Sequence, residues 1–327
     1  MKSESMNTIK GYLCVVAAAI MWASSGTAGK ALFEGGMTPF QLVQIRVTLS
    51  TVILAASFGI YDRQLFRIRI KDLGYFLLLG GVSMTMVQGG YFYAISKIQV
   101  AAAILLEYLA PILVALFSIC FWKERLTLSK ISALLLAFSG CYLVVGGYSL
   151  HLFLLNRLGI IGGLTAAVGF AGYTLLGERG MHRYGPWTVF FYAIAFSAIV
   201  WHILYPPFHY IVAGFDWSQW GWVLYITIVG TIFPFGLYFV GVNYIRSTRA
   251  MITANLEPIS AGFMAFFLLG ETMELLQIFG GILVIGAIVL LQVQREQDEM
   301  IPVLIRKQKR KKEEQELKLN LARKQRR

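Results

Sequence analysis

Three charged side chains interrupt long apolar stretches of this sequence: Arg46, Glu107 and Glu257. In the apolar interior of a bilayer each would cost roughly 2.5–3.5 kcal/mol on insertion scales, so each needs a charged partner, a wet cavity or a proton. A guanidinium can bind a carboxylate, and a carboxylate can bind an ammonium group or carry a proton. These residues are therefore the first candidates for substrate binding or coupling.

Arg46 and Glu107 each lie about eight residues into an apolar stretch, 38–60 and 99–122 respectively. Both stretches are predicted to enter a bilayer from the same side. Because a helix rises about 1.5 Å per residue, the two charges share a depth of roughly 10–12 Å. We expect an ion pair between them, or a cavity that both line. The alternatives are a buried pair that only fixes helix register, and side chains that snorkel to the surface.

Glu257 differs, because the internal repeat described below places Ile194 at the position equivalent to Arg46. A buried carboxylate without a neighbouring cation tends to stay protonated. We expect Glu257 to carry a coupling proton or to hold an ammonium group of a ligand. The alternative is a protonated side chain that is hydrogen-bonded within the helix bundle.

Two prolines, Pro111 and Pro258, lie close to the two glutamates. A proline inside a helix removes a backbone hydrogen bond and kinks the helix. The carbonyl groups that it frees could accept hydrogen bonds from an amine. Equally, the prolines could serve only as hinges or packing kinks.

Aromatic side chains are dense within the apolar stretches: Trp22, Tyr91, Tyr93, Tyr108, Tyr173 and Tyr238. Such rings can line a cavity that accepts amphipathic or cationic solutes. Trp22, Tyr91, Tyr93 and Tyr238 are the candidate lining residues. The alternative for each ring is ordinary helix packing.

The composition indicates the elements that must position these residues. Of the 327 residues, 57% are hydrophobic and 14% are charged, and the net charge is +12. An ordinary soluble domain has about 25% charged residues. These values exclude a soluble globular enzyme, a disordered chain and a secreted disulfide scaffold. We predict an all-α integral membrane protein with ten transmembrane helices, at residues 9–29, 38–60, 73–95, 99–122, 128–147, 158–177, 187–206, 218–243, 248–269 and 276–293.

Residues typical of metal, cofactor or covalent chemistry are scarce. Cys14, Cys120 and Cys141 lie in apolar runs without a CxxC pair, and the four histidines show no metal-ligand spacing. There is no P-loop motif for nucleotide phosphates. We therefore expect no metal, no cofactor and no enzymatic site; an intramembrane enzyme remains an alternative that lacks a catalytic dyad or triad.

The distribution of Lys and Arg predicts the orientation. With the N-terminus in the cytoplasm, the predicted inner segments carry thirteen Lys and Arg, the outer side carries three, and residues 294–327 add twelve on the inside. Positive loops favour the cytoplasmic side. We expect both termini in the cytoplasm. Residues 294–327 are predicted to form a basic cytoplasmic tail that touches anionic lipid, or a solvated tail that only fixes topology; nucleic acid is not an expected partner.

The two halves of the chain repeat at a spacing of about 147 residues. Residues 89–95 (GGYFYAI) align with 236–242 (GLYFVGV), Pro111 with Pro258, and Glu124 with Glu271. Five spans per half is an odd number, so the halves are predicted to be inverted repeats, 8–147 and 158–293, as in many secondary transporters. The first span, which could otherwise be a signal peptide, has a partner in the second half and is expected to be retained. Chance similarity between apolar helices is the alternative.

Several segments resemble the EamA type of the drug/metabolite transporter superfamily. The segments are WASS at 22–25, QIR at 44–46, LEYLAP at 106–111, KERLT at 123–127, NLEP at 255–258, GET at 270–272 and QIFGG at 277–281. Ala23 stands where the family usually has glycine, and the turn at Glu124 has WKE in place of Gly-Glu. The LEYLAP segment is similar to that of the threonine/homoserine exporters of this family. Glu124 and Glu271 are interpreted as structural, because each precedes a helix whose N-terminus favours a carboxylate.

The resemblance implies a secondary transporter of the bacterial inner membrane that exports a small organic metabolite by alternating access, with amino acids as the first expectation. Its expected partners are the small-molecule substrate and the lipid bilayer. Two alternatives remain open. One is a flippase for lipid-linked molecules with the same architecture, and the other is a membrane scaffold that acts through its basic tail without transport.

Overall fold

The computed structural model describes residues 2–98, 100–122, 127–144, 147–148, 156–206, 214–269 and 274–293. The predicted tail at 294–327, and the predicted structural glutamates Glu124 and Glu271, lie outside the described residues. The described part of the chain is helical and contains no β-strand.

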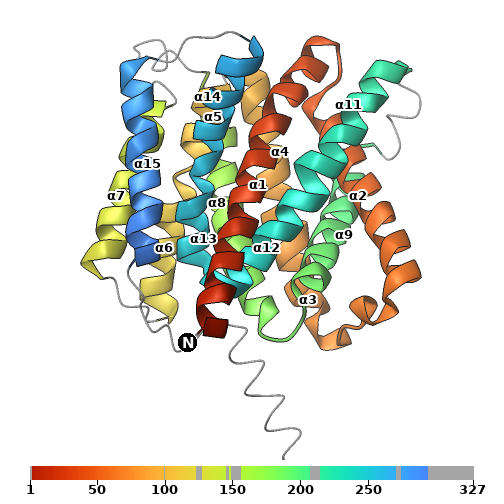
Figure 1. The fold of residues 1–327 in the computed structure, drawn as a ribbon. Coiled ribbons are helices and arrows are strands. Elements are labelled where there is room, and N and C mark those ends of the chain that lie inside the picture. Colours follow the sequence, from red (N-terminus) through yellow and green to blue (C-terminus); the bar gives the residue numbers. More distant parts are fainter. Residues whose placement is uncertain are drawn as a thin grey trace, which may run out of the picture.

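The long helices lie roughly along one common axis and pack side by side (Figure 1). The first half contains α1 (Lys2–Glu34), α2 (Pro39–Tyr61), η1 (Arg63–Phe66), η2 (Ile70–Asp72), α3 (Leu73–Phe76), η3 (Leu77–Met84), α4 (Thr85–Lys97), α5 (Val100–Glu107), α6 (Ala110–Trp122) and α7 (Leu128–Val144). The second half contains α8 (Arg157–Met181), α9 (Pro186–Leu204), α11 (Trp217–Thr227), η5 (Ile228–Ile232), α12 (Phe233–Ile245), α13 (Ser247–Ala254), α14 (Leu256–Leu269) and α15 (Leu275–Val293).

The predicted class, an all-α membrane protein, is confirmed. Six helical segments are long and apolar enough to span a bilayer: Thr8–Gly26, Pro39–Tyr61, Ile70–Lys97, Arg157–Met181, Pro186–Leu204 and Trp217–Ile245. Three shorter apolar helices lie at Ala102–Phe117, Leu128–Val144 and Leu275–Leu290. The count of ten spans remains a prediction.

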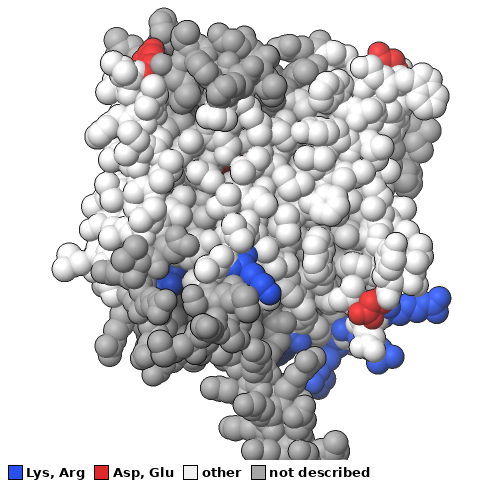
Figure 2. All heavy atoms as spheres, in the orientation of Figure 1, with Lys and Arg blue, Asp and Glu red and all other residues white. Residues whose placement is uncertain are grey.

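On one face of the molecule, the charged side chains among the described residues lie mainly toward the two ends of the bundle (Figure 2). On the face shown in Figure 2, Lys and Arg gather at the end where Figure 1 places the N-terminus, and uncharged atoms form a broad band above them. Large apolar side chains such as Leu13, Val52 and Ile161 are exposed. An apolar band between polar ends is the surface that a bilayer core requires.

The two halves share local features that are about 147 residues apart. Helices α2 and α9 both begin on a proline, Pro39 and Pro186, which is favoured at a first helical position because that residue needs no N–H partner. The third span of the first half contains a π-helical segment, η3, and its counterpart in the second half contains η5. Such segments widen the helix and displace backbone carbonyls, and they occur often at functional sites.

The packing partners are also exchanged between the halves. Helix α1 packs along α12, and α8, its counterpart in the second half, packs along α4. Gly90 shows how closely α4 and α8 approach, because a Cβ atom there would lie 2.7 Å from the carbonyl oxygen of Gly162 and from the amide nitrogen of Ala166. Two backbones can come this close only where a side chain is absent.

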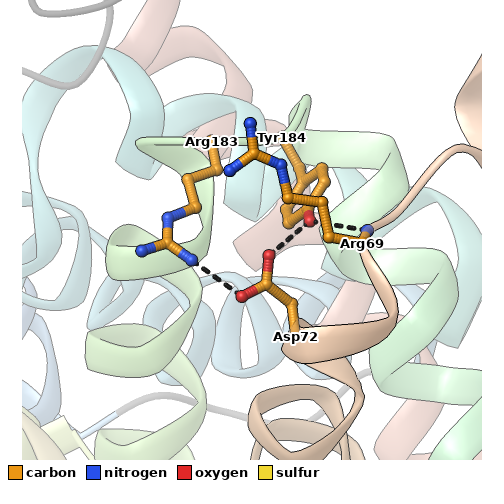
Figure 3. A network of polar contacts seen from close by, with 4 residues as sticks. All are labelled: Arg69, Asp72, Arg183 and Tyr184. Atoms are coloured by element: carbon orange, nitrogen blue, oxygen red, sulfur yellow. Dashed lines mark hydrogen bonds and ion pairs between the residues drawn. The ribbon is translucent and has the colours of Figure 1, made fainter.

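A polar network ties the helix ends together at the cation-rich end of the bundle (Figure 3). The Asp72 carboxylate accepts from Nη1 of Arg183 at 2.7 Å and from the hydroxyl of Tyr184 at 2.5 Å. The backbone N–H of Arg69 donates to the same hydroxyl at 3.1 Å. This network joins the start of α3 to the turn between α8 and α9. Burial, followed by the hydrogen bond to Asp72, raises the pKa of Tyr184.

Candidate functional site

Two helices are interrupted near the middle of the bundle. Helix α5 ends at Glu107 and α6 begins at Ala110, so that Tyr108 and Leu109 form a turn between them. Helix α13 ends at Ala254 and α14 begins at Leu256. Pro111 and Pro258 each fall in the first turn of the second piece, where a missing N–H leaves no partner unsatisfied. The chain thus breaks just before each of the two prolines that were predicted to kink it.

The breaks lie beside a cavity with about 410 Å³ of atom-free space, including the part that is open to its surroundings. The enclosed volume that a water-sized sphere can reach is about 40 Å³, well below the roughly 300–1,000 Å³ of drug-sized ligand sites. The lining residues come from both halves of the chain and are Trp22, Ser25, Arg46, Val87, Gln88, Tyr91, Phe92, Glu107, Phe170, Gly230, Phe235 and Glu257.

The structure brings five predicted site residues together in the lining of this cavity: Trp22, Arg46, Tyr91, Glu107 and Glu257. It places two others elsewhere. Tyr93 stacks on Phe40, with ring centres 5.7 Å apart, and Tyr238 is fully buried behind Trp22, with ring centres 5.4 Å apart. Both rings make contacts of the packing kind that was the alternative for every aromatic residue.

Arg46 is held by η5 and not by a carboxylate. Its Nε donates to Oγ1 of Thr231 at 2.8 Å, and its Nη2 donates to the carbonyl oxygen of Gly230 at 3.0 Å. The guanidinium carbon lies 4.6 Å from the centre of the Phe92 ring. Of the two arrangements expected for Arg46 and Glu107, the described residues show the shared cavity and no direct ion pair.

This arrangement leaves part of the guanidinium available. Arginine has five N–H donors in a planar fork, and the two bonds to η5 use one on Nε and one on Nη2. The hydroxyl of Thr231 passes its own hydrogen to the carbonyl of Ile226 at 2.9 Å, so it can accept from Arg46 without conflict. The remaining donors can bind an anionic group in the cavity.

The two carboxylates have different surroundings. Glu107 is the last residue of α5 and lines the cavity, and within the described residues its carboxylate has no hydrogen bond or ion pair. Glu257 lies in the first turn of α14, where its Oε2 is 2.9 Å from the hydroxyl of Tyr108. The positive end of the α14 dipole favours a carboxylate at this position. One carboxylate is open to a ligand, and the other has a partner.

Sequence reasoning missed several lining residues, including Ser25, Gln88, Phe92 and Gly230. Gln88 gave a usable signal, because its amide lies in an apolar stretch three residues before Tyr91. Gly230 gave none, because it contributes a backbone carbonyl. Among the described residues there is no group of three or more His, Cys, Asp and Glu that could hold a metal ion.

A second buried charge cluster lies at the cation-rich end. Nε of Arg246 donates to Oε1 of Glu178 at 3.0 Å, and the backbone N–H of Ser247 donates to Oε2 at 2.8 Å. Arg246 joins α12 to α13 with φ +68° and ψ 168°, a backbone conformation that costs a residue with a side chain about 1–3 kcal/mol. The cluster fixes α8 to this junction.

Comparisons with known proteins agree with the helical architecture. A sequence profile of the EamA-like transporter family matches residues 9–146 and 157–293. One solved crystal structure superposes with a TM-score of 0.65 at 17% identity, covering 88% of this chain and 98% of the other, which shows likeness of fold alone.

Three relatives illustrate the sequence similarity. An uncharacterized transporter of Archaeoglobus fulgidus is 30% identical over 244 residues, covering 74% of this chain and 86% of its own. The uncharacterized inner membrane transporter YicL of Salmonella typhimurium is 27% identical, and the match covers 88% of this chain and 96% of the relative. The threonine/homoserine exporter RhtA of Salmonella typhimurium is 26% identical, and the match covers 81% of this chain and 85% of the relative.

Proposed function

The chain belongs to the EamA-like transporter family, within the drug/metabolite transporter superfamily, and from that premise we propose that it exports an amino acid or a closely similar metabolite by alternating access. The observation that carries the proposal is the cavity beside the two broken helices. It combines the guanidinium of Arg46, the open carboxylate of Glu107 and several aromatic rings.

These groups match the chemistry of a zwitterion. The free donors of Arg46 would bind the substrate carboxylate, since arginine binds carboxylates through a planar pair of N–H groups. The carboxylate of Glu107 would accept from the substrate ammonium group. Trp22, Phe170 and Phe235 would enclose an apolar side chain. Glu257, which already contacts Tyr108, is left for proton coupling.

The relatives support the substrate class only in part. RhtA is named a threonine/homoserine exporter, and its similarity to this chain extends over most of both sequences. The other two relatives are named as transporters without a substrate. Amino acids are therefore the first compounds to test.

Alternating access would arise from the two halves, 8–147 and 158–293, acting as inverted repeats around the cavity. The exchange of packing partners and the matched π-helical segments support this arrangement. The cation-rich end would face the cytoplasm with both termini, as expected for an inner membrane protein, and the basic tail would contact anionic lipid there. The contacts of Asp72 and Glu178 would then close the cytoplasmic side.

Counterflow in proteoliposomes tests the proposal. Vesicles preloaded with an unlabelled L-amino acid are diluted into the same labelled compound, for a panel that includes L-threonine and L-homoserine. We expect the wild type to accumulate label and Glu107→Gln to lose most of it. Glu274→Gln, whose side chain is exposed next to α15, is the matched control and should transport normally.

Two results would contradict the proposal. If folded wild-type protein accumulates no amino acid, the substrate class is wrong, and accumulation of a lipid-linked compound would favour a flippase. If Glu107→Gln transports as well as the control, the cavity is not the binding site.

A further inference from the structure

A single hydroxyl connects the two broken helices. Tyr108 lies in the turn between α5 and α6, and its hydroxyl is 2.5 Å from the carbonyl oxygen of Ala254 and 2.9 Å from Oε2 of Glu257. Ala254 ends α13, and Glu257 lies in the first turn of α14. One side chain from the break in the first half therefore reaches both sides of the break in the second half.

Counting hydrogens determines what this contact requires. A phenol has one hydrogen to donate, and a backbone carbonyl can only accept. If that hydrogen goes to the nearer atom, the carbonyl of Ala254, the phenol oxygen can only accept from Glu257. The carboxyl group of Glu257 must then carry a proton. An ionised carboxylate would compete with the carbonyl for the same hydrogen, leaving one buried acceptor unsatisfied.

The neighbours of Glu257 are consistent with a neutral group. The charged and titratable side chains around it are Glu107 from α5, Tyr91 from α4, Arg46 from α2 and Cys141 from α7. Arg46 directs its hydrogen bonds to Thr231 and Gly230 of η5. The described parts of α1 and α15 provide no further titratable partner for this carboxyl group.

We propose that Tyr108 is a positioning residue through which the protonation of Glu257 controls the contact between the two broken helices. With the proton in place, Glu257 donates to Tyr108, and Tyr108 donates to the carbonyl of Ala254. When the proton leaves to water in the cavity, the phenol hydrogen turns to the carboxylate and releases the end of α13. Movement of α13 and α14 relative to α5 and α6 is thereby linked to proton release.

The inference rests on the proposed transport function, because it says how a proton would drive that transport. It also makes a prediction that needs no substrate. Infrared difference spectra of the reconstituted full-length protein, taken between acidic and alkaline pH, should contain a protonated-carboxyl band. This band should be absent in Glu257→Gln and shifted in frequency in Tyr108→Phe, which removes the oxygen that accepts from it.

Tyr173→Phe is the matched control for the loss of a buried hydroxyl. Tyr173 is fully buried, and within the described part of the chain its hydroxyl makes a single long hydrogen bond of 3.4 Å, to the carbonyl of Phe235. Its variant should leave the carboxyl band unchanged. Absence of a protonated-carboxyl band from the wild type, or an identical band in Tyr108→Phe, would overturn the proposal.

Transport provides a second test, with L-threonine as the labelled probe. Counterflow needs no net proton movement, whereas accumulation driven by a pH gradient does. In Tyr108→Phe we expect the ratio of gradient-driven accumulation to counterflow to fall about tenfold, the effect of one hydrogen bond to a charged group. Glu257→Gln can donate to Tyr108 through its amide, but it has no proton to release and should lose the response of transport to pH.

The two proposals can fail separately. If the wild type shows no L-threonine counterflow, the proposed substrate is wrong, and the infrared test still decides the role of Tyr108. If counterflow is present but gradient-driven accumulation in Tyr108→Phe equals that of Tyr173→Phe, the positioning role is wrong and the transport function stands.

Discussion

The guanidinium of Arg46 and the backbone carbonyl of Gly230 are joined by a hydrogen bond of 3.0 Å between α2 and η5. The carbonyl belongs to a π-helical segment. Irregular backbone at membrane depth is tolerated where it is buried in protein or lines a cavity. Here it positions the cation of the candidate site.

Arg46→Lys should impair transport although it keeps the charge. A lysine ammonium group cannot form the bonds to Thr231 and Gly230 in the same planar geometry or stack on Phe92. We expect counterflow to fall about tenfold or more, because a hydrogen bond to a charged group contributes about 1.5–3 kcal/mol. Thr231→Ser keeps the accepting hydroxyl and should transport nearly normally. Equal activity of the lysine variant and the wild type would mean that only the charge matters.

Glu178→Gln should destabilise the protein far more than Arg183→Ala. Glu178 is 1% exposed, and removing its charge breaks its buried ion pair with Arg246, which typically costs about 3–5 kcal/mol. The Arg183 side chain is 62% exposed, and a pair of this kind contributes about 0–1 kcal/mol. The midpoint of thermal unfolding in detergent measures the stability of both variants. A similar midpoint for the two variants would contradict the burial argument.

Gly90→Ala should disrupt the contact between α4 and α8. The added Cβ atom would lie 2.7 Å from two backbone atoms, which cannot move aside as a side chain can. We expect loss of stability and of folded yield. Gly59→Ala in α2 has open space around the new atom and should be neutral or stabilising by up to about 1 kcal/mol. Yield of monodisperse protein after purification compares the two, and equal yields would contradict the close approach.

Tyr148 should titrate at unusually high pH. Its hydroxyl donates to Oε2 of Glu274 at 2.5 Å, and this hydrogen bond raises the pKa of Tyr148 to about 12 from an ordinary value of 10.0. A raised pKa means that the contact stabilises the folded protein below pH 10 and is lost as the pH rises through 12. Between these two pH values, ultraviolet difference spectra of the wild type should show one phenolate fewer than spectra of Glu274→Gln. Identical titration curves would show that the bond is absent in solution.

Much of the fold followed from local properties of the sequence. Apolar stretches, the clustering of Lys and Arg and the spacing of the prolines are visible without coordinates. The charged candidates Arg46, Glu107 and Glu257 could also be identified, because a charge in an apolar span is costly wherever the helix faces. The structure places all three on one cavity.

The partners of these residues could not be read from the sequence. Arg46 was expected to pair with Glu107 or to share a cavity with it; the two share a cavity, and the hydrogen bonds of Arg46 go to a hydroxyl and a carbonyl 184–185 residues away. A backbone carbonyl has no residue type to reveal it. Tyr108, Tyr93 and Tyr238 looked alike as aromatic residues in apolar spans, and only helix rotation separates the tyrosine that contacts Glu257 from the two that pack.

The sequence by itself therefore determined the class of protein, the costly charges and the places where helices break, because each depends on residues close together in the chain. The tertiary structure decided which side chains meet and which hydrogen goes to which acceptor. Those outcomes depend on how each helix is rotated and how closely it approaches its neighbours, and glycines such as Gly90 set that approach only in the packed bundle.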